Sequence, residues 1–263
     1  MEIADKVFVV TGAGNGMGRQ VALGLLRRGA RIAAVDLDAV GLAGTAKRAS
    51  TTGVPMSTHV LDVTDGEAVT ALPNQVTEAH GQIDGLVNIA GIIHRFAPFS
   101  ELSPDETDRI MAVNFDATVR MCRAFLPTLL TRPEANITNM SSLSALLPFA
   151  SQTLYSASKG AVKQFSEALY AELCETNVRV VTLFPGNIDT NLTGNSGVAM
   201  LDAGGRKVRS TTVEAAGQKI VDGIAGDEFR VLIGTDALAL DILARLSAKR
   251  ATRLVARQIK SVL

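Results

Sequence analysis

The sequence alternates between short apolar runs and longer segments in which apolar residues recur at helical spacing. The apolar runs occupy residues 7–10, 32–35, 60–61, 83–89, 137–140, 178–184 and 231–233, and the helical segments occupy residues 18–28, 38–51, 65–80, 103–130, 153–176 and 213–224. Several runs are continuously apolar, which is typical of strands buried on both faces of a parallel sheet. The alternation predicts an α/β fold with a doubly wound, Rossmann-like, mostly parallel seven-stranded sheet in a single domain over residues 1–263.

Two segments depart from this alternation. Residues 187–211 are rich in Gly, Asn, Ser and Thr, and a loop of that length inside a compact domain indicates a substrate loop. Residues 236–263 predict a C-terminal helix, with Leu238, Ile242, Leu246, Arg253 and Ile259 in helical register and six cations but no acid after Asp241. A solvated or oligomer-facing helix is the favoured interpretation, and a helix that docks on a membrane surface or a partner is the alternative.

Composition excludes several classes of protein. Lys and Arg number 26, as do Asp and Glu, so the formal net charge of zero excludes a broadly basic nucleic-acid-binding protein. Two cysteines are too few for a disulfide framework, which favours a reducing compartment. No apolar run approaches the ~18 residues of a membrane span, and the first residues lack the basic start of a secretory signal. We therefore expect a cytoplasmic protein, and the three histidines show no spacing typical of a metal site.

A glycine-rich turn follows the first apolar run. The sequence Thr-Gly-Ala-Gly-Asn-Gly-Met-Gly at residues 11–18 fits the pattern T-G-x3-G-x-G on Gly12, Gly16 and Gly18. Glycines permit a tight strand-to-helix turn whose backbone N–H groups approach an anion, and the helix N-terminus favours a pyrophosphate there. A tight turn with no ligand would use the same residues, so the turn alone does not decide between the two.

The acid that ends the second apolar run favours a dinucleotide. Asp36 lies 18 residues after Gly18, within the ~20 expected of a carboxylate that binds the adenosine ribose 2′-hydroxyl. A carboxylate at this place repels a 2′-phosphate, and Leu37 and Asp38 follow it in place of a cation. The sequence therefore favours NAD over NADP.

A tyrosine and a lysine lie four residues apart in the segment 153–176. At helical spacing Tyr155 and Lys159 share one face, where an ammonium lowers the pKa of a phenol and makes it a usable general acid or base. Such a pair on its own is more often a surface helix pair. Ser142 follows the fifth predicted strand, at the end of the sheet where open α/β sheets bind ligands. Asn114 lies inside a predicted helix, where asparagine is unfavourable unless its amide makes a specific contact.

With these motifs in this order and spacing, the chain resembles the short-chain dehydrogenase/reductase family over residues 6–233. The motifs that carry the resemblance are Thr11-Gly12…Gly16…Gly18, Asp62-Val63, Asn88-Ile-Ala-Gly91, Asn114, Ser142, Tyr155…Lys159 and Pro185-Gly186…Thr190. Asn88-Ile89 replaces the usual paired asparagines, Ala145 stands where many members carry glycine, and Met17 where isoleucine is usual.

The resemblance implies a catalytic tetrad. Tyr155 would be the general acid/base, Ser142 would position the substrate oxygen, Lys159 would bind the nicotinamide ribose and lower the tyrosine pKa, and Asn114 would hold a water in the proton relay. Its implied cofactor-binding residues are Gly12, Asn15, Gly16, Met17, Gly18, Asp36, Leu37, Asp62, Val63, Asn88, Ala90, Gly91, Tyr155, Lys159, Pro185, Gly186, Ile188 and Thr190.

The expected activity is hydride transfer between NAD and a secondary alcohol or ketone, with an aliphatic, alicyclic or steroid-like substrate. The expected substrate pocket consists of His94, Leu143, Ser144, Leu147, Phe149, Gln152, Asn187, Leu192 and Met200. A carbonyl reductase that works mainly in the reducing direction is the first alternative, and a nucleotide-binding regulator or scaffold without turnover is the second. The resemblance also implies a homo-oligomer, either a tetramer or a dimer.

Overall fold

A seven-stranded sheet forms the centre of the protein in the computed structural model, which describes residues 1–189, 196 and 210–260 without the side chains of residues 235, 236, 238, 239 and 258–260. The strands are β1 (Val7–Thr11), β2 (Arg31–Asp36), β3 (Met56–Val60), β4 (Gly85–Asn88), β5 (Ala135–Met140), β6 (Val178–Pro185) and β9 (Arg230–Ile233). They lie in the order β3-β2-β1-β4-β5-β6-β9 and every neighbouring pair is parallel. The predicted doubly wound, Rossmann-like fold is confirmed.

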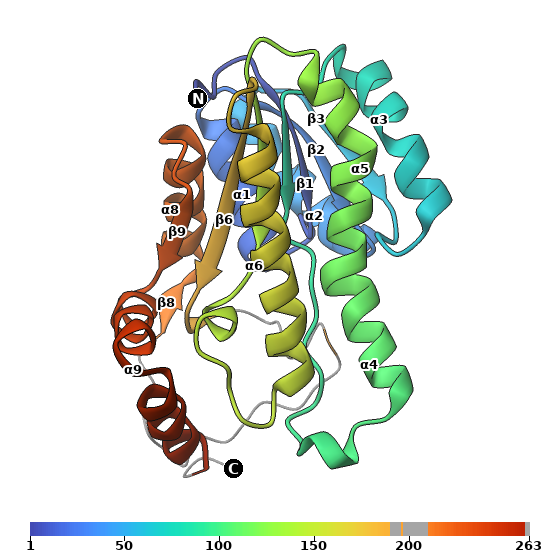
Figure 1. Ribbon diagram of the computed structural model, residues 1–263. Helices are drawn as coiled ribbons and strands as arrows, with labels where there is room; N and C mark the ends of the chain where they lie inside the picture. Colours follow the sequence, from blue (N-terminus) through green and yellow to red (C-terminus); the bar gives the residue numbers. More distant parts are fainter. Residues whose placement is uncertain (190–195, 197–209, 261–263) are drawn as a thin grey trace.

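Helices cover both faces of the sheet. They are α1 (Gly16–Arg27), α2 (Ala39–Ala49), α3 (Gly66–His80), α4 (Pro104–Met111), α5 (Ala117–Leu130), α6 (Thr153–Leu173), α8 (Val213–Ala225) and α9 (Thr235–Lys260). The helices α1, α2 and α8 pack on one face, and α3, α5 and α6 pack on the other (Figure 1). The carboxyl ends of the strands point toward the bottom of Figure 1, where α4 and α9 also lie.

The side chains of strand β1 alternate between the hydrophobic cores on the two faces of the sheet. Val7 and Val9 enter the core beneath α3, α5 and α6, whereas Phe8 and Val10 enter the core beneath α1, α2 and α8. All four side chains are fully buried, which explains the absence of polar alternation. On the neighbouring strand, a Cβ at Gly85 would lie 2.2 Å from the Phe8 ring, so only glycine accommodates that ring.

Two predicted elements were wrong in their bounds. The third strand is Met56–Val60 and ends before Leu61. It lies at the edge of the sheet and carries the polar residues Ser57, Thr58 and His59, so it has no continuous apolar run by which the sequence could have located it. The single helix predicted over residues 103–130 is divided into α4, a π-helical turn η3 (Ala112–Asp116) and α5. Asn114 lies at the centre of that turn, and its contacts are described below.

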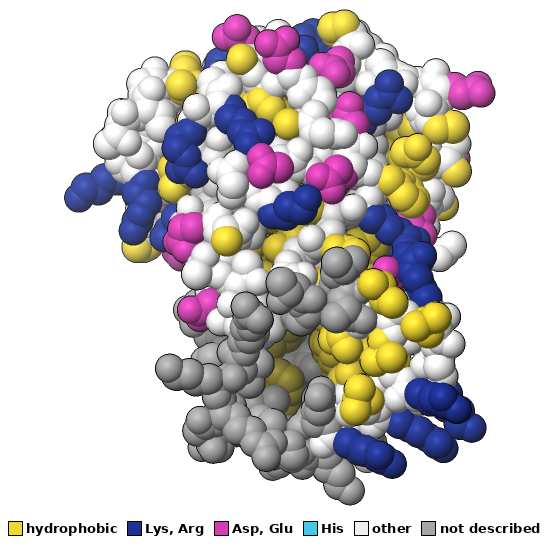
Figure 2. Space-filling view, turned by 90° about the vertical axis from the view of Figure 1, so that its left-hand side faces the viewer, with side chains coloured by type: hydrophobic (Ala, Val, Ile, Leu, Met, Phe, Trp, Pro, Cys, Tyr) yellow, Lys and Arg dark blue, Asp and Glu magenta, His cyan; other side chains and the backbone are white. Residues whose placement is uncertain are grey.

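The C-terminal helix is present, but its predicted apolar register is not the face that packs. Ile242 is 51% exposed and Leu246 is 78% exposed, whereas Ala251 and Val255 are buried against Leu147. Ser247 has a non-helical backbone (φ −161°, ψ 88°), so the two halves of α9 present different faces to the protein. Figure 2 shows hydrophobic side chains next to Lys and Arg side chains in the lower part of this face, where α9 lies.

A short second sheet was not predicted. Strand β7 (Ile188–Asp189) pairs in parallel with β8 (Thr211–Thr212), so these two strands bracket most of the predicted substrate loop. Among the described residues, no helix is long and apolar enough to cross a membrane.

Candidate active site

A cavity of about 770 Å³ opens at the carboxyl ends of β1, β2 and β4. This is the point where the strand order reverses between β1 and β4, and open α/β sheets bind ligands in that crevice. Of the predicted cofactor residues, the cavity is lined by Gly12, Asn15, Gly16, Met17, Gly18, Asp36, Leu37, Asp62, Val63, Ala90 and Gly91. One concave surface therefore brings together predicted residues from four separate segments of the chain.

The glycine turn between β1 and α1 leaves no room for a side chain at Gly12 or Gly18. Gly12 and Gly16 have φ angles of +67° and +51°, in the left-handed region that favours glycine. A Cβ at Gly12 would lie 3.0 Å from the Ala90 backbone nitrogen, and one at Gly18 would lie 2.0 Å from the Gly12 carbonyl oxygen. Helix α1 begins at Gly16, so its free N–H groups face the cavity beside this turn and suit a phosphate group.

Backbone N–H groups hold the Asp36 carboxylate at the end of β2. Its Oδ2 accepts a hydrogen bond from the Gly14 backbone at 2.7 Å, and its Oδ1 accepts one from the Asp38 backbone at 2.9 Å. A Cβ at Gly14 would lie 2.7 Å from Oδ2, so glycine is required for this contact. The carboxylate is thus fixed at the rim of the cavity with oxygen lone pairs left for a ligand.

The charges around the cavity are mainly negative. Asp38 and Asp62 line it together with Asp36, and Arg109 is the one cation among the described lining residues. Arg19 lies close by, but its guanidinium donates to the carbonyl oxygens of Gly14 and Gly41 and does not line the cavity. A dianionic 2′-phosphate beside Asp36 would face carboxylates without a paired cation.

Asn114 occupies the π-helical turn between α4 and α5, and the additional residue in that turn aims its amide at the loop after β4. Its Oδ1 accepts from the Ile92 backbone nitrogen at 2.9 Å, while its Nδ2 donates to the Ile92 carbonyl oxygen and to Ser158 Oγ, both at 3.0 Å. The side chain is fully buried. The π-turn is therefore the local feature that lets an asparagine join α6 to this loop.

Lys159 reaches the same place from α6. Its side chain is buried, and Nζ donates to the Met140 carbonyl oxygen at 2.9 Å and lies 6.0 Å from the centroid of the Tyr155 ring. A Cβ at Gly91 would lie 3.2 Å from Nζ and 3.1 Å from Asn114 Oδ1. Burial lowers the pKa of the Lys159 ammonium to about 8. The amine and the amide therefore face one small space above Gly91.

Tyr155 lies at the start of α6, opposite Ser142. Burial raises the pKa of the Tyr155 phenol, and a hydrogen bond from the Ser142 hydroxyl partly counters that rise. The prediction that Lys159 lowers the pKa of this phenol was wrong. Lys159 Nζ donates to the Met140 carbonyl oxygen, and burial, which raises the pKa of Tyr155, is the largest effect on it. Ser142 also accepts a hydrogen bond from the Ser144 backbone at 3.1 Å, which fixes its oxygen toward the turn η4 (Leu143–Ala145).

Several predicted cofactor residues lie away from the cavity. Asn88 is buried beneath it, where its Nδ2 donates to Asn139 Oδ1 at 2.9 Å, so its amide joins β4 to β5 and does not line the adenosine side. Pro185, Gly186 and Ile188 lie at the end of β6 and in β7 and do not line it either. Thr190 is outside the described residues.

The predicted substrate residues divide into four groups. The first is buried and consists of Leu143, Ser144, Gln152 and His94. Leu147 and Phe149 instead form a small apolar cluster with Ala251 and Val255 of α9, and Asn187 is exposed next to β7. Leu192 and Met200 are outside the described residues. No group of His, Cys, Asp or Glu suited to a metal ion occurs in residues 1–189, 196 and 210–260.

Sequence reasoning did not find every residue of the cavity. The additional lining residues are Asp38, Leu61, Thr64, Ile89, Ile92, Arg109, Ala112 and Val113. Helical spacing could not have indicated Arg109 or Val113, because they precede Asn114 by five residues and by one, and not by the three or four that share a helix face. Leu61 and Thr64 could not be separated from other loop residues without the sheet.

The match to a family model agrees with this geometry. The model described as short chain dehydrogenase covers residues 6–200, which include the glycine turn, Asp36, Asn114, Ser142, Tyr155 and Lys159. This chain belongs to the short-chain dehydrogenase family. The family resemblance predicted from the motifs is therefore confirmed.

Relatives of this short-chain dehydrogenase extend over nearly its whole length. It is 35% identical over 260 residues to SadH of Mycobacterium tuberculosis, which is named as an oxidoreductase, and the match covers 95% of this chain and 94% of SadH. It is 33% identical over 242 residues to 1-deoxy-11-beta-hydroxypentalenate dehydrogenase of Streptomyces avermitilis, covering 90% and 87% of the two chains.

Solved structures share the fold. The crystal structure of a short chain dehydrogenase/reductase from Burkholderia phymatum in complex with NAD is 26% identical, with a TM-score of 0.85 over 95% of this chain and 96% of that one. The 3-ketoacyl-(acyl-carrier-protein) reductase of Brucella melitensis, complexed with NADH, is 26% identical with a TM-score of 0.78. This short-chain dehydrogenase is an oxidoreductase with a nicotinamide-dinucleotide-binding fold.

Proposed function

We propose that this short-chain dehydrogenase transfers hydride between NAD and a secondary alcohol or ketone, with Tyr155 as general acid/base. The observation that carries the proposal is the convergence of Lys159 and Asn114 above Gly91, at the rim of the cavity that Asp36 and the glycine turn form. A bound nicotinamide would supply the hydride acceptor or donor. The cavity suits the dinucleotide that carries this group, because Gly12 and Gly18 place no side chain in the turn and helix α1 begins there with free N–H groups.

The protein's own residues would move the proton. In the oxidising direction the Tyr155 phenolate accepts the proton of the alcohol oxygen, while the Ser142 hydroxyl donates a hydrogen bond to that oxygen as charge develops on it. Lys159 would hold the nicotinamide ribose and stabilise the phenolate through its ammonium. Asn114 Oδ1 faces the space beside Nζ, which suits a water that relays the proton toward solvent.

Asp36 favours NAD as the dinucleotide. Its carboxylate is fixed by two backbone N–H groups and can accept a hydrogen bond from a ribose 2′-hydroxyl. A 2′-phosphate in that position would meet the carboxylates of Asp36 and Asp38, which repel it.

A carbonyl reductase is the second candidate, and the pKa of Tyr155 favours it. Because burial raises that pKa, the phenol holds its proton at neutral pH and is ready to donate it to a ketone oxygen. The same residues serve both directions, so the ratio of NADH to NAD would decide the direction of flux.

The proposal is tested by comparing Tyr155→Phe with Tyr170→Phe. Both tyrosines belong to α6, but Tyr170 is 40% exposed and stacks on Phe229 far from the cavity. We expect Tyr155→Phe to lose at least 10³-fold in turnover of secondary alcohols with NAD while NADH fluorescence still reports binding, and Tyr170→Phe to keep full turnover. Unchanged turnover in Tyr155→Phe would instead support a nucleotide-binding scaffold without catalysis.

The protein is further proposed to act in the cytoplasm as a homo-oligomer. The helices α4, α5 and α6 form an outer face of the molecule in Figure 1 that a second copy could cover. Light scattering at micromolar concentration distinguishes a monomer from a dimer or tetramer.

A further inference from the structure

Three buried polar atoms near Tyr155 have no hydrogen-bond partner. They are Nε2 of His94, Oε1 of Gln152 and Oγ of Ser144, in side chains that are 4%, 4% and 1% exposed. Buried polar atoms are nearly always satisfied by protein, water or ligand, because leaving them unsatisfied destabilises the fold. Three such atoms at one end of the sheet therefore indicate a missing partner.

The three side chains adjoin the proposed reacting groups. Gln152 ends the loop before α6, three residues ahead of Tyr155, and its Nε2 donates to the His94 carbonyl oxygen at 2.8 Å. Ser144 lies in η4, where its backbone nitrogen donates to Ser142 Oγ at 3.1 Å. The hydroxyl of Ser142 in turn bonds to the phenol of Tyr155. Direct hydrogen bonds thus join His94 to Gln152 and Ser144 to Ser142.

The hydrogen bonds that these residues already make identify their free atoms. His94 Nδ1 lies 2.7 Å from the Arg95 carbonyl oxygen, which can only accept, so Nδ1 carries the proton in a neutral ring and Nε2 has a free lone pair. Gln152 uses its Nε2 as donor, which leaves Oε1 as acceptor. The unpartnered set is therefore two acceptors and one hydroxyl.

Two acceptors and a hydroxyl favour a ligand group that donates hydrogen bonds over one that is an anion. A carboxylate would place oxygen lone pairs against those of His94 and Gln152. The neighbouring cation, Arg95, is engaged by Glu106 at 2.9 Å and lies 3.8 Å from Glu101. A neutral hydroxyl can donate to one acceptor while it accepts from Ser144.

We propose that the substrate of this enzyme carries a second hydroxyl group, apart from the reacting carbinol, which donates to His94 Nε2 or Gln152 Oε1. The substrate class is thus a neutral diol or hydroxyketone, and a monoalcohol or a hydroxy acid is handled poorly. This inference rests on the proposed function, because it places the reacting carbon between Ser142 and Tyr155.

The test compares alcohols that share a carbon skeleton. Oxidation with NAD is measured for cyclohexanol, the 1,2-, 1,3- and 1,4-cyclohexanediols and 3-hydroxycyclohexanecarboxylate, and binding of each to the enzyme–NADH complex is followed by the fluorescence of bound NADH. We expect at least one diol to exceed cyclohexanol about 10-fold or more in kcat/KM or affinity, since a site built to bond a hydroxyl rejects the analogue that lacks it. The hydroxy acid should be no better than cyclohexanol.

Three variants connect the preference to these atoms. His94→Asn keeps a side-chain donor for Arg95 but removes Nε2, and Gln152→Met removes Oε1 at similar volume. Either should reduce the diol-to-cyclohexanol ratio about 10-fold while NADH binding persists. Thr182→Val is the matched control, because Thr182 Oγ1 is also buried without a partner but lies within β6, and its ratio should equal that of the wild type.

The outcomes separate the two proposals. If NADH binds and no diol is preferred in turnover or binding, or if both variants keep the wild-type ratio, this inference is wrong and the proposed function stands. Water alone would then satisfy the three atoms. If NADH does not bind, the proposed function fails and this inference fails with it.

Discussion

Gly91 faces the ammonium of Lys159 with the side of its backbone that carries no side chain, since a Cβ there would lie 3.2 Å from Lys159 Nζ and 3.1 Å from Asn114 Oδ1. That spacing is tighter than most contacts of a real Cβ, so one methyl group at residue 91 would push the lysine and the asparagine apart. The loop after β4 at Gly91, the Lys159 side chain on α6 and the Asn114 side chain in the π-turn therefore meet at a single point.

Gly91→Ala should therefore reduce turnover 10- to 100-fold by displacing Lys159, with a weaker effect on folding. Steady-state kinetics and NADH titration measure the two effects. The control is Gly160→Ala on the residue next to Lys159, where a Cβ meets open space and the helix gains about 0.5–1 kcal/mol of stability. Equal activity in the two variants would show that the space above Gly91 is not used.

Lys159→Met should stabilise the protein while it abolishes turnover. Burial lowers the Lys159 pKa from 10.5 to about 8, so the charged form costs about 3 kcal/mol of folding free energy below pH 8. Between pH 8 and 10.5 the unfolded chain binds the proton and the native state does not, so wild-type stability rises with pH across that range.

Urea denaturation at pH 7 and pH 10 checks this sign. The stability gain of Lys159→Met should be largest at pH 7 and become small at pH 10, where the native amine is already neutral. The unpaired Met140 carbonyl oxygen reduces the gain by about 1 kcal/mol at both pH values. A gain that grows with pH would contradict the lowered pKa of Lys159.

Asp36→Ala should shift the cofactor preference from NADH toward NADPH. Loss of the carboxylate removes a hydrogen bond to the ribose, about 10-fold in NADH affinity, and removes the repulsion that a 2′-phosphate meets. Fluorescence titration with NADH and NADPH measures the ratio of their affinities. Asp38→Ala removes the same charge but no contact to Gly14, so its ratio should change less.

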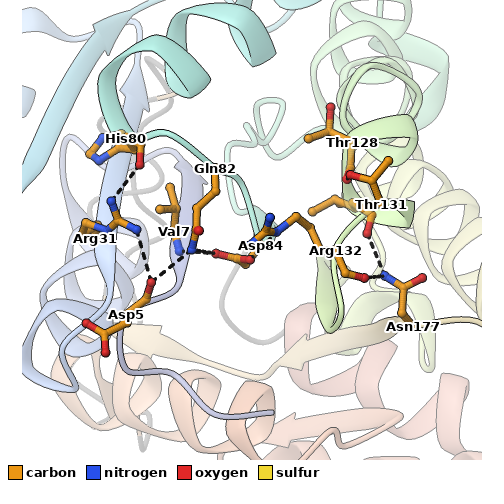
Figure 3. Close-up of polar contacts among 11 residues, drawn as sticks. Asp5, Val7, Arg31, His80, Gln82, Asp84, Thr128, Thr131, Arg132 and Asn177 are labelled. Carbon is orange, nitrogen blue, oxygen red and sulfur yellow. Dashed lines mark hydrogen bonds and ion pairs between the residues drawn. The ribbon is translucent and has the colours of Figure 1, made fainter.

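Asp84 is expected to matter for folding and not for catalysis. Its buried carboxylate lies at the amino ends of the strands, where it accepts from Val7, Gln82 and Arg132 at 2.8–2.9 Å (Figure 3). Asp84→Ala leaves those donors unpaired and should lower the free energy of unfolding by about 3–5 kcal/mol. The specific activity of the folded fraction should remain that of the wild type.

The exposed pair of Arg28 and Asp222 provides the comparison. Asp222→Ala breaks an ion pair whose carboxylate is 48% exposed, and such a change costs about 1 kcal/mol or less. Similar denaturation midpoints for Asp84→Ala and Asp222→Ala would show that burial does not strengthen the contacts drawn in Figure 3.

Sequence alone determined the sheet and the parts of the site that depend on local spacing. The buried strands β1 and β2 appear as continuous apolar runs at residues 7–10 and 32–35. In the glycine turn, Gly12 and Gly16 have positive φ angles, and a Cβ at Gly12 or Gly18 would collide with backbone atoms. Tyr155 and Lys159 are brought together by one helical turn. These features are short-range, so the order of residues is enough to predict them.

Tertiary structure alone decided what depends on neighbours distant in sequence. Arg109 joins the cavity only because α4 packs against α6 near the ends of the strands, and the amide of Asn114 in the π-turn bonds to the backbone of Ile92. Burial sets the pKa of Tyr155 and leaves His94 Nε2 without a partner. Burial and hydrogen-bond partners depend on contacts between residues that are distant in sequence, so they cannot be predicted from the segment that contains the residue.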